Sequence, residues 1–184
     1  MYHTAKTIVS ATLALSMVAK LDRSVLIGAD VVKNDVARVL GVGVRIGLTD
    51  VPARHSLHAD DTVLQTNFDS LAFLPCRRML PNVDEPFASD RMARLVRELS
   101  EHDPDRIVIV DAPPLHAGTE ASVLAHMVED VVVLVEADKT PQGSVTEALH
   151  QLKGCDSVSM VPNKARRRSS DHIAYGYGTQ GSLG

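Results

Sequence analysis

The apolar residues of this 184-residue chain gather in short uninterrupted runs. The clearest runs are residues 107–110 and 131–135, which have no polar break and are rich in β-branched side chains. Such runs predict strands that are buried on both faces, as in a parallel sheet. Shorter runs at residues 24–27, 71–75 and 158–161 predict further strands of the same kind. The pattern therefore predicts a sheet whose strands are distributed along most of the chain.

The segments between these runs have helical periodicity. Helices are predicted over residues 5–19, 35–40, 90–101, 120–127 and 145–152. In the third helix, Ser89 is a plausible N-cap, and one face carries the apolar residues Met92, Leu95, Val96 and Leu99. Strands that alternate with helices imply right-handed crossovers. The fold class is therefore predicted to be α/β, with a parallel sheet and helices on both of its faces.

The first apolar segment has two interpretations. Residues 8–19 are apolar and small, with Lys6 before them and Lys20 after them, which is the pattern of a signal peptide. The segment is too short to span a bilayer. The alternative is a buried helix over residues 5–19 that contains Leu13, Leu15 and Val18. The strand and carboxylate that follow, ending at Asp30, favour it. A processed amino terminus would establish the signal peptide.

Composition limits the classes of function. Apolar residues make up 45% of the chain and charged residues 23%, which is ordinary for one globular domain. The net charge of -4, without a basic stretch in the body of the chain, argues against a nucleic-acid binder. Cys76 and Cys155 have no metal-ligand spacing, so they are interpreted as reduced cytosolic thiols, although a single disulfide remains possible.

The character of the chain changes after Lys164. A basic run, residues 166–168, leads into a Gly- and Ser-rich end that contains Tyr175 and Tyr177, two of the three tyrosines. The domain is therefore predicted to cover residues 1–164, followed by a flexible tail over residues 165–184. The tyrosines are in the tail either by chance or because an exposed phenol on a mobile segment can enter the active site of another molecule.

Asp111 is the leading candidate for chemistry. It ends the strand at residues 106–111, and Pro113 and Pro114 follow, which cannot continue a strand ladder. Ligands of open α/β sheets bind at the carboxyl ends of the strands. A carboxylate there can hold magnesium beside a nucleotide phosphate. The alternative is an Asp that caps the next turn, and this stretch alone does not decide between them.

Lys6 and Thr7 open the first helix, as the last two residues of a P-loop do. In a P-loop the lysine reaches the phosphates and the hydroxyl binds magnesium. Here Ala5 replaces the glycine next to the lysine, and the strand that should precede the loop is absent from the sequence. The match is therefore partial.

Several motifs together resemble one family. Residues 108–114, 120–125, 135–140 and 163–165 match a run found in bacterial tyrosine autokinases (BY-kinases) of exopolysaccharide loci, particularly the exosortase-associated type. Residues 71–75, 81–82 and 88–92 and the glycine-spaced tyrosines of the tail also fit. The resemblance covers nearly the whole chain.

The resemblance implies a P-loop ATPase of MinD/ParA-like architecture that lacks its first strand, with ATP and Mg²⁺ as cofactors. It implies autophosphorylation within a ring of identical subunits, control of exopolysaccharide synthesis, and a membrane chain-length determinant protein as partner, with no nucleic acid. The implied location is cytoplasmic, peripheral to the inner membrane through that partner. The implied site residues are Asp30 and Asp111 as catalytic residues, Ala5, Lys6, Thr7 and Asn163 at the nucleotide, Thr7 and Asp111 at the metal, and Tyr175 and Tyr177 as phosphoacceptors.

Three departures from the family pattern bear on activity. Gly28 stands where the family has the first acid of an Asp-x-Asp pair, and His3 and Ala5 stand where it has loop glycines. A Cβ at such positions obstructs the approach of backbone amides to phosphate. Weak nucleotide binding is therefore expected. A non-catalytic regulatory module of the same assembly, or a partitioning ATPase of the MinD/ParA type, are the alternatives.

Overall fold

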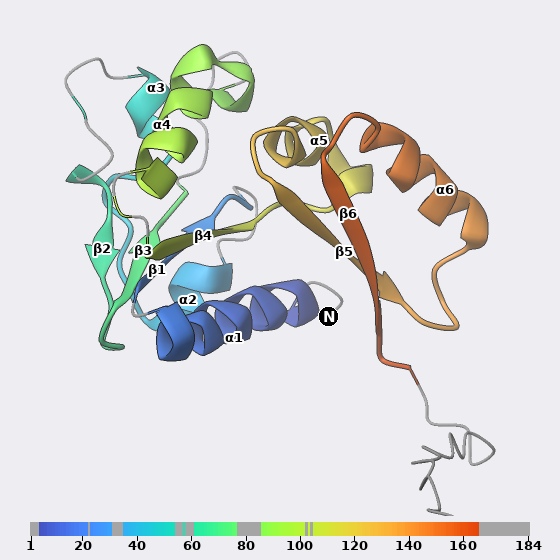
Figure 1. Cartoon of the computed structure of the whole chain (residues 1–184), viewed down its shortest axis with the longest axis horizontal. Helices are drawn as coiled ribbons and strands as arrows, with labels where there is room; N and C mark the ends of the chain where they lie inside the picture. The colour runs from blue at the N-terminus through green and yellow to red at the C-terminus, as the bar shows by residue number, and fades with distance from the viewer. Residues whose placement is uncertain are drawn as a thin grey trace, which may run out of the picture.

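The computed structural model describes residues 4–21, 23–30, 35–53, 57, 61–76, 86–101, 103 and 105–165 (Figure 1). The predicted tail with Tyr175 and Tyr177 lies outside the described residues, as does His3. The predictions made for them stay predictions.

A four-stranded sheet forms one half of the molecule. Its strands are β1 (Arg23–Gly28), β2 (Leu64–Gln65), β3 (Leu71–Leu74) and β4 (Arg106–Asp111), in the order β2-β3-β1-β4. β1 is parallel to β3 and to β4, which confirms the predicted parallel sheet, but β2 pairs antiparallel with β3. The two-residue edge strand was not predicted, because it is too short to have a recognisable pattern.

Two further strands pair with each other in a separate sheet. β5 (Asp130–Glu136) and β6 (Ser157–Asn163) are parallel along their full length. Figure 1 shows α5 (Glu120–Ala125) and α6 (Gln142–Gln151) packed beside this pair. The described part of the chain therefore holds two sheets, where the sequence predicted one.

The prediction that the two longest apolar runs are buried on both faces is wrong. In β4 the four apolar residues are half-buried, and in β5 Val132 is 51% exposed. The reason is the division of the sheet, since β4 lies at the edge of one sheet and β5 belongs to a two-stranded sheet. An edge strand keeps one side open to solvent, whatever its sequence.

The helix α1 (Thr4–Leu21) covers one face of the four-stranded sheet together with α2 (Asp35–Leu40) (Figure 1). It confirms the predicted helix, and Leu15 and Val18 of the predicted core residues are partly buried against the core. Thr7, Ala11 and Ala14 are buried, whereas Leu13 is 37% exposed. These small side chains let the helix approach the strands closely, and the Ser24 hydroxyl donates a hydrogen bond to the Ala14 carbonyl at 3.1 Å.

The opposite face is covered by α4 (Asp90–Glu101) and the short α3 (Asp50–Ala53). The apolar face predicted for α4 is confirmed, because Met92, Leu95, Val96 and Leu99 are all buried. The Ser89 hydroxyl accepts a hydrogen bond from the Met92 amide at 3.2 Å, as an N-cap does. The 3₁₀ turns η2 (Pro86–Ala88) and η3 (Leu115–Ala117) complete the described elements.

Two smaller predictions are also resolved. α2 ends at Gly41, whose φ of 67° lies in the left-handed region that glycine adopts without strain. Cys76 and Cys155 are both free thiols, so no disulfide joins them. Within the described ranges, no helix combines the length and apolarity that crossing a bilayer requires.

Candidate nucleotide-binding site

The candidate site lies where the carboxyl end of β4 meets the first turns of α1. The Asp111 side chain is 1% exposed and accepts hydrogen bonds from three residues of α1. Lys6 Nζ lies 2.7 Å from Oδ1, Thr7 Oγ1 lies 2.9 Å from Oδ2, and Ser10 Oγ lies 3.2 Å from Oδ1. We call these four residues the Asp111 network.

The geometry of an α-helix explains why three donors converge. Residues 6, 7 and 10 are separated by one, three and four positions, so Lys6 and Thr7 both lie one turn from Ser10 on the same side of the helix. Ser10 was not predicted as a site residue. The sequence contained the signal. Ser10 is four residues after Lys6 and three after Thr7, so on a helix its hydroxyl lies on the same side as both of them.

The network also fixes α1 to the sheet. A buried carboxylate costs free energy unless it is hydrogen-bonded and paired with a charge. Lys6, whose side chain is 26% exposed, provides that charge. Because Lys6 and Asp111 are 105 residues apart, the pair joins distant parts of the chain.

The backbone holds Asp111 in place at the end of the sheet. Gly28 and Asp111 are the last register partners of β1 and β4, and the Ala29 amide donates to the Asp111 carbonyl at 3.0 Å. The 3₁₀ turn η3 begins after Pro113 and Pro114, so the strand ends at the carboxylate. The predicted strand end is confirmed.

The space beside Gly28 is already filled. A Cβ at Gly28 would lie 3.1 Å from Cε2 and 3.2 Å from Cζ of Phe73, and 3.5 Å from Val36 Cβ. Phe73 is fully buried, so its ring has little room to move. The position where the family has an acid is therefore closed by an aromatic ring in this structure.

The other predicted site residues are distributed around this edge. Asp30 is buried two residues beyond the end of β1, the strand that neighbours β4, so it lies at the same edge as Asp111. Ala5 is half-buried, one residue before Lys6. Asn163 ends β6 in the other sheet, where its carbonyl accepts a hydrogen bond from the Ala137 amide at 2.8 Å. The structure thus brings Lys6, Thr7 and Asp111 into direct contact, but not Asn163.

A second charged cluster lies at the carboxyl ends of β5 and β6. Glu136 Oε1 lies 3.6 Å from Lys139 Nζ and 3.2 Å from Lys164 Nζ. Asp138 and Lys164 adopt left-handed backbone conformations, with φ of 60° and 57°. These residues belong to two of the family-like runs, and the cluster joins the ends of β5 and β6.

The donors at Asp111 are chemically suited to magnesium. Mg²⁺ prefers oxygen ligands and usually keeps several waters, with one or two protein ligands. Thr7 and Asp111 place a hydroxyl and a carboxylate oxygen 2.9 Å apart. Across the described ranges, no group of three His, Cys, Asp or Glu side chains forms a metal cage. The Thr7 hydroxyl and the Asp111 carboxylate are therefore oxygen groups of the kind that fit the ion.

No protein-family model matches the chain. The putative tyrosine-protein kinase CapB of Staphylococcus aureus is 25% identical over 175 residues, which cover 94% of this chain and 75% of CapB. The tyrosine-protein kinase YwqD of Bacillus subtilis is 27% identical over 173 residues, covering 94% and 71%.

Solved structures agree on the fold. The kinase domain of the Escherichia coli tyrosine kinase ETK aligns with a TM-score of 0.73 at 24% identity, covering 94% of this chain and 68% of that one. A cobyrinic acid a,c-diamide synthase from Mycobacterium smegmatis with a bound ATP analog and magnesium aligns with a TM-score of 0.69 at 17% identity, covering 88% and 70%.

The chain thus has the α/β fold of the P-loop ATPases. Within that class, its curated relatives are bacterial tyrosine-protein kinases, as the motifs predicted.

Proposed function

We propose that this chain is a nucleotide-binding domain of the tyrosine-autokinase type that acts in exopolysaccharide synthesis, and that it binds ATP weakly. The observation that carries the proposal is the contact of Lys6 and Thr7 with Asp111 at the carboxyl end of β4. The names of the curated relatives support the kinase class.

Each member of the network has a role in this proposal. Lys6 and Thr7 stand at the N-terminus of α1, where free backbone amides and the helix dipole favour a phosphate. Asp111 fixes the direction of the Thr7 hydroxyl through the 2.9 Å hydrogen bond. Bound Mg-ATP would provide the phosphoryl group and partly neutralise its charge. Asp30, at the same sheet edge, is the candidate acid beside the reacting phosphate.

The same network explains why binding is weak. Lys6 already satisfies Asp111, so a phosphate must compete with a buried carboxylate for the ammonium group. The Cβ of Ala5 hinders the backbone from approaching the phosphate. Both effects lower affinity without altering the fold.

The proposed assembly follows the relatives. We place Tyr175 and Tyr177 as phosphoacceptors presented to a neighbouring copy of the chain in a ring, and a membrane chain-length determinant protein as the partner. Asn163, at the end of β6, is proposed to lie beside the nucleotide. An Asn163→Ala variant with unchanged ATP affinity would remove it from the site.

One observation favours a second function. Phe73 occupies the space beside Gly28, so restoring the family's acid requires the ring to move. This favours a non-catalytic regulatory module in which the Asp111 network serves only to hold α1. In that case ATP binding would be absent rather than weak.

Calorimetric titration with ATP and magnesium separates the two functions. The kinase-type domain predicts magnesium-dependent binding in the millimolar range, lost in Asp111→Asn and retained in the exposed control Asp69→Asn. The combined change His3→Gly and Ala5→Gly should strengthen that binding, because it restores the loop glycines. Absence of binding in both the wild type and the glycine variant would establish the regulatory module.

A further inference from the structure

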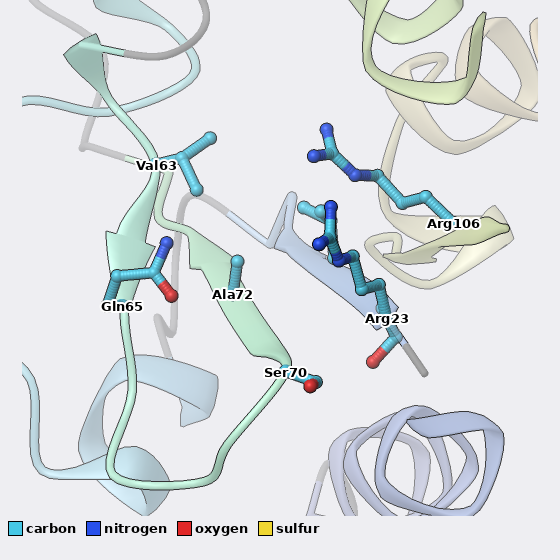
Figure 2. A pocket seen from close by; sticks show the side chains of 8 residues that line it. Arg23, Val63, Gln65, Ser70, Ala72 and Arg106 are labelled. Carbon is cyan, nitrogen blue, oxygen red and sulfur yellow. The ribbon is translucent and has the colours of Figure 1, made fainter. Parts of the chain in front are cut away.

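A cavity lies at the opposite end of the sheet from Asp111 and is independent of the proposed nucleotide site. It has a volume of about 390 Å³ and opens at the amino ends of β1 and β4 (Figure 2). Arg23 and Arg106 are the first register partners of these two strands, whereas Gly28 and Asp111 are the last. The whole length of the strands thus separates the cavity from the Asp111 network.

Two guanidinium groups border the cavity. Neighbouring parallel strands are about 4.8 Å apart, and register partners point to the same face of the sheet. Figure 2 shows the side chains of Arg23 and Arg106 lying side by side, with Val63 and Ala72 across the cavity from them. Two cations so close repel each other. An anion between them would be attracted to both, and this attraction would offset the repulsion.

Among the described residues, a single carboxylate, that of Asp103, lies near both of these charges. Asp103 Oδ2 lies 2.8 Å from Arg23 Nη1, and Oδ1 accepts a hydrogen bond from the Asp105 amide at 3.2 Å. Both oxygens of this carboxylate are therefore engaged. The half-buried guanidinium of Arg106 has no hydrogen bond or ion pair with any residue that the structure describes.

Among the described residues, the rest of the lining is half apolar and half polar. Val25, Val63 and Ala72 belong to the apolar cluster on the α4 face of the sheet, and Ser24, Gln65 and Ser70 are the polar lining residues. A concave apolar surface with a few placed polar groups is the usual form of a small-molecule site. The size and the lining suit an organic molecule rather than a bare ion.

We propose that this cavity binds a small organic oxyanion, a carboxylate or phosphate ester with a flat apolar body. The oxyanion accepts hydrogen bonds from the Arg106 guanidinium, whose planar fork fits such groups. Arg23 flanks it, and the apolar body rests on the half-buried Val63 and Ala72. A monoanion would bring the described charges here, two guanidinium groups and the Asp103 carboxylate, to neutrality.

Nuclear magnetic resonance titration with phenyl phosphate, benzoate and inorganic phosphate tests the proposal. Phenyl phosphate and benzoate should shift the amides of residues 23–25 and 70–72, and inorganic phosphate, which has no apolar body, should bind more weakly. Arg106→Gln should weaken phenyl phosphate at least about tenfold, the effect of one charged hydrogen bond. Arg106→Lys keeps the charge but loses the fork, so its affinity should be intermediate.

Two further variants complete the test. Arg45→Gln, an exposed arginine that does not line the cavity, should leave the affinity unchanged. Ala72→Leu fills part of the cavity, so it should weaken phenyl phosphate more than inorganic phosphate and test the site even if Arg106→Gln does not fold. Equal phenyl phosphate affinity in the wild type and a folded Arg106→Gln would overturn the proposal, as would shifts confined to residues near Asp111. Self-association of the chain that Arg106→Gln abolishes would also overturn it, because a carboxylate of a second copy would then be the occupant.

Discussion

The two sheets are built from similar sequences but differ in how they are buried. Leu26, Ile27, Phe73 and Leu74 in the four-stranded sheet have no exposed surface. In the two-stranded sheet, Val132, Val158, Met160 and Val161 are between 37% and 53% exposed, and α6 has no buried residue. An apolar run thus specifies a strand, but its neighbours decide its burial. Most of the folding free energy is therefore expected from the four-stranded half.

The largest expected effect is at the Asp111 network. Lys6→Met should lower the free energy of unfolding by about 3–5 kcal/mol, because it leaves the carboxylate buried without its counter-charge. Urea denaturation measures the change. The double variant Lys6→Met with Asp111→Asn should be more stable than Lys6→Met alone, since the uncompensated charge is gone. A double variant less stable than the single one would contradict the charge explanation.

The next effect is at the contact between Gly28 and Phe73. Gly28→Ala should cost about 1–3 kcal/mol, as overpacking of a core does. Adding Phe73→Leu should recover part of this loss, because the smaller side chain leaves room for the Cβ. If Phe73→Leu and Gly28→Ala are simply additive in thermal unfolding, the ring does not limit this position.

In the two-stranded half, the expected effect depends on pH. His126 Nδ1 lies 2.7 Å from the Ser122 carbonyl and Nε2 lies 3.1 Å from the Lys153 carbonyl, so both ring nitrogens can donate only when the ring is protonated. The hydrogen bonds to Ser122 and then to Lys153 raise the pKa of His126 above its ordinary value of 6.5. A raised pKa contributes stability that is complete below the ordinary value and is lost as pH rises through the raised one.

His126→Gln should therefore lower the thermal midpoint at about pH 5.5 and have less effect at about pH 9. Thr146→Ser, on the neighbouring helix α6, is the control, because neither side chain titrates in this pH range. A loss of stability in His126→Gln that is the same at both pH values would mean that protonation does not strengthen these contacts.

The smallest effect is expected on the exposed strands. Val132→Thr should change the free energy of unfolding by no more than about 0.5 kcal/mol, because half of the side chain is already in water. The matched change Val25→Thr in β1 places a hydroxyl in a buried apolar site and should cost about 1–3 kcal/mol. Similar losses in guanidinium denaturation would show that β5 is as buried as β1 in solution.

The sequence alone determined most of the local structure and singled out Asp111 as the candidate for chemistry. The bounds of β4, α2 and α4 and the cap at Ser89 were predicted because capping, periodicity and apolar runs are local properties. Asp111 was identified for the same reason, since a carboxylate at the end of an apolar run followed by two prolines can be recognised without a fold. The family resemblance predicted which relatives the chain has, namely bacterial tyrosine-protein kinases.

Only the tertiary structure decided which residues meet. The division between β4 and β5, the small-residue face of α1, the closure of Gly28 by Phe73 and the pairing of Arg23 with Arg106 all depend on contacts between residues far apart in the sequence. Long-range contacts leave little trace in local periodicity, because periodicity reports which side of an element is apolar and not what covers it.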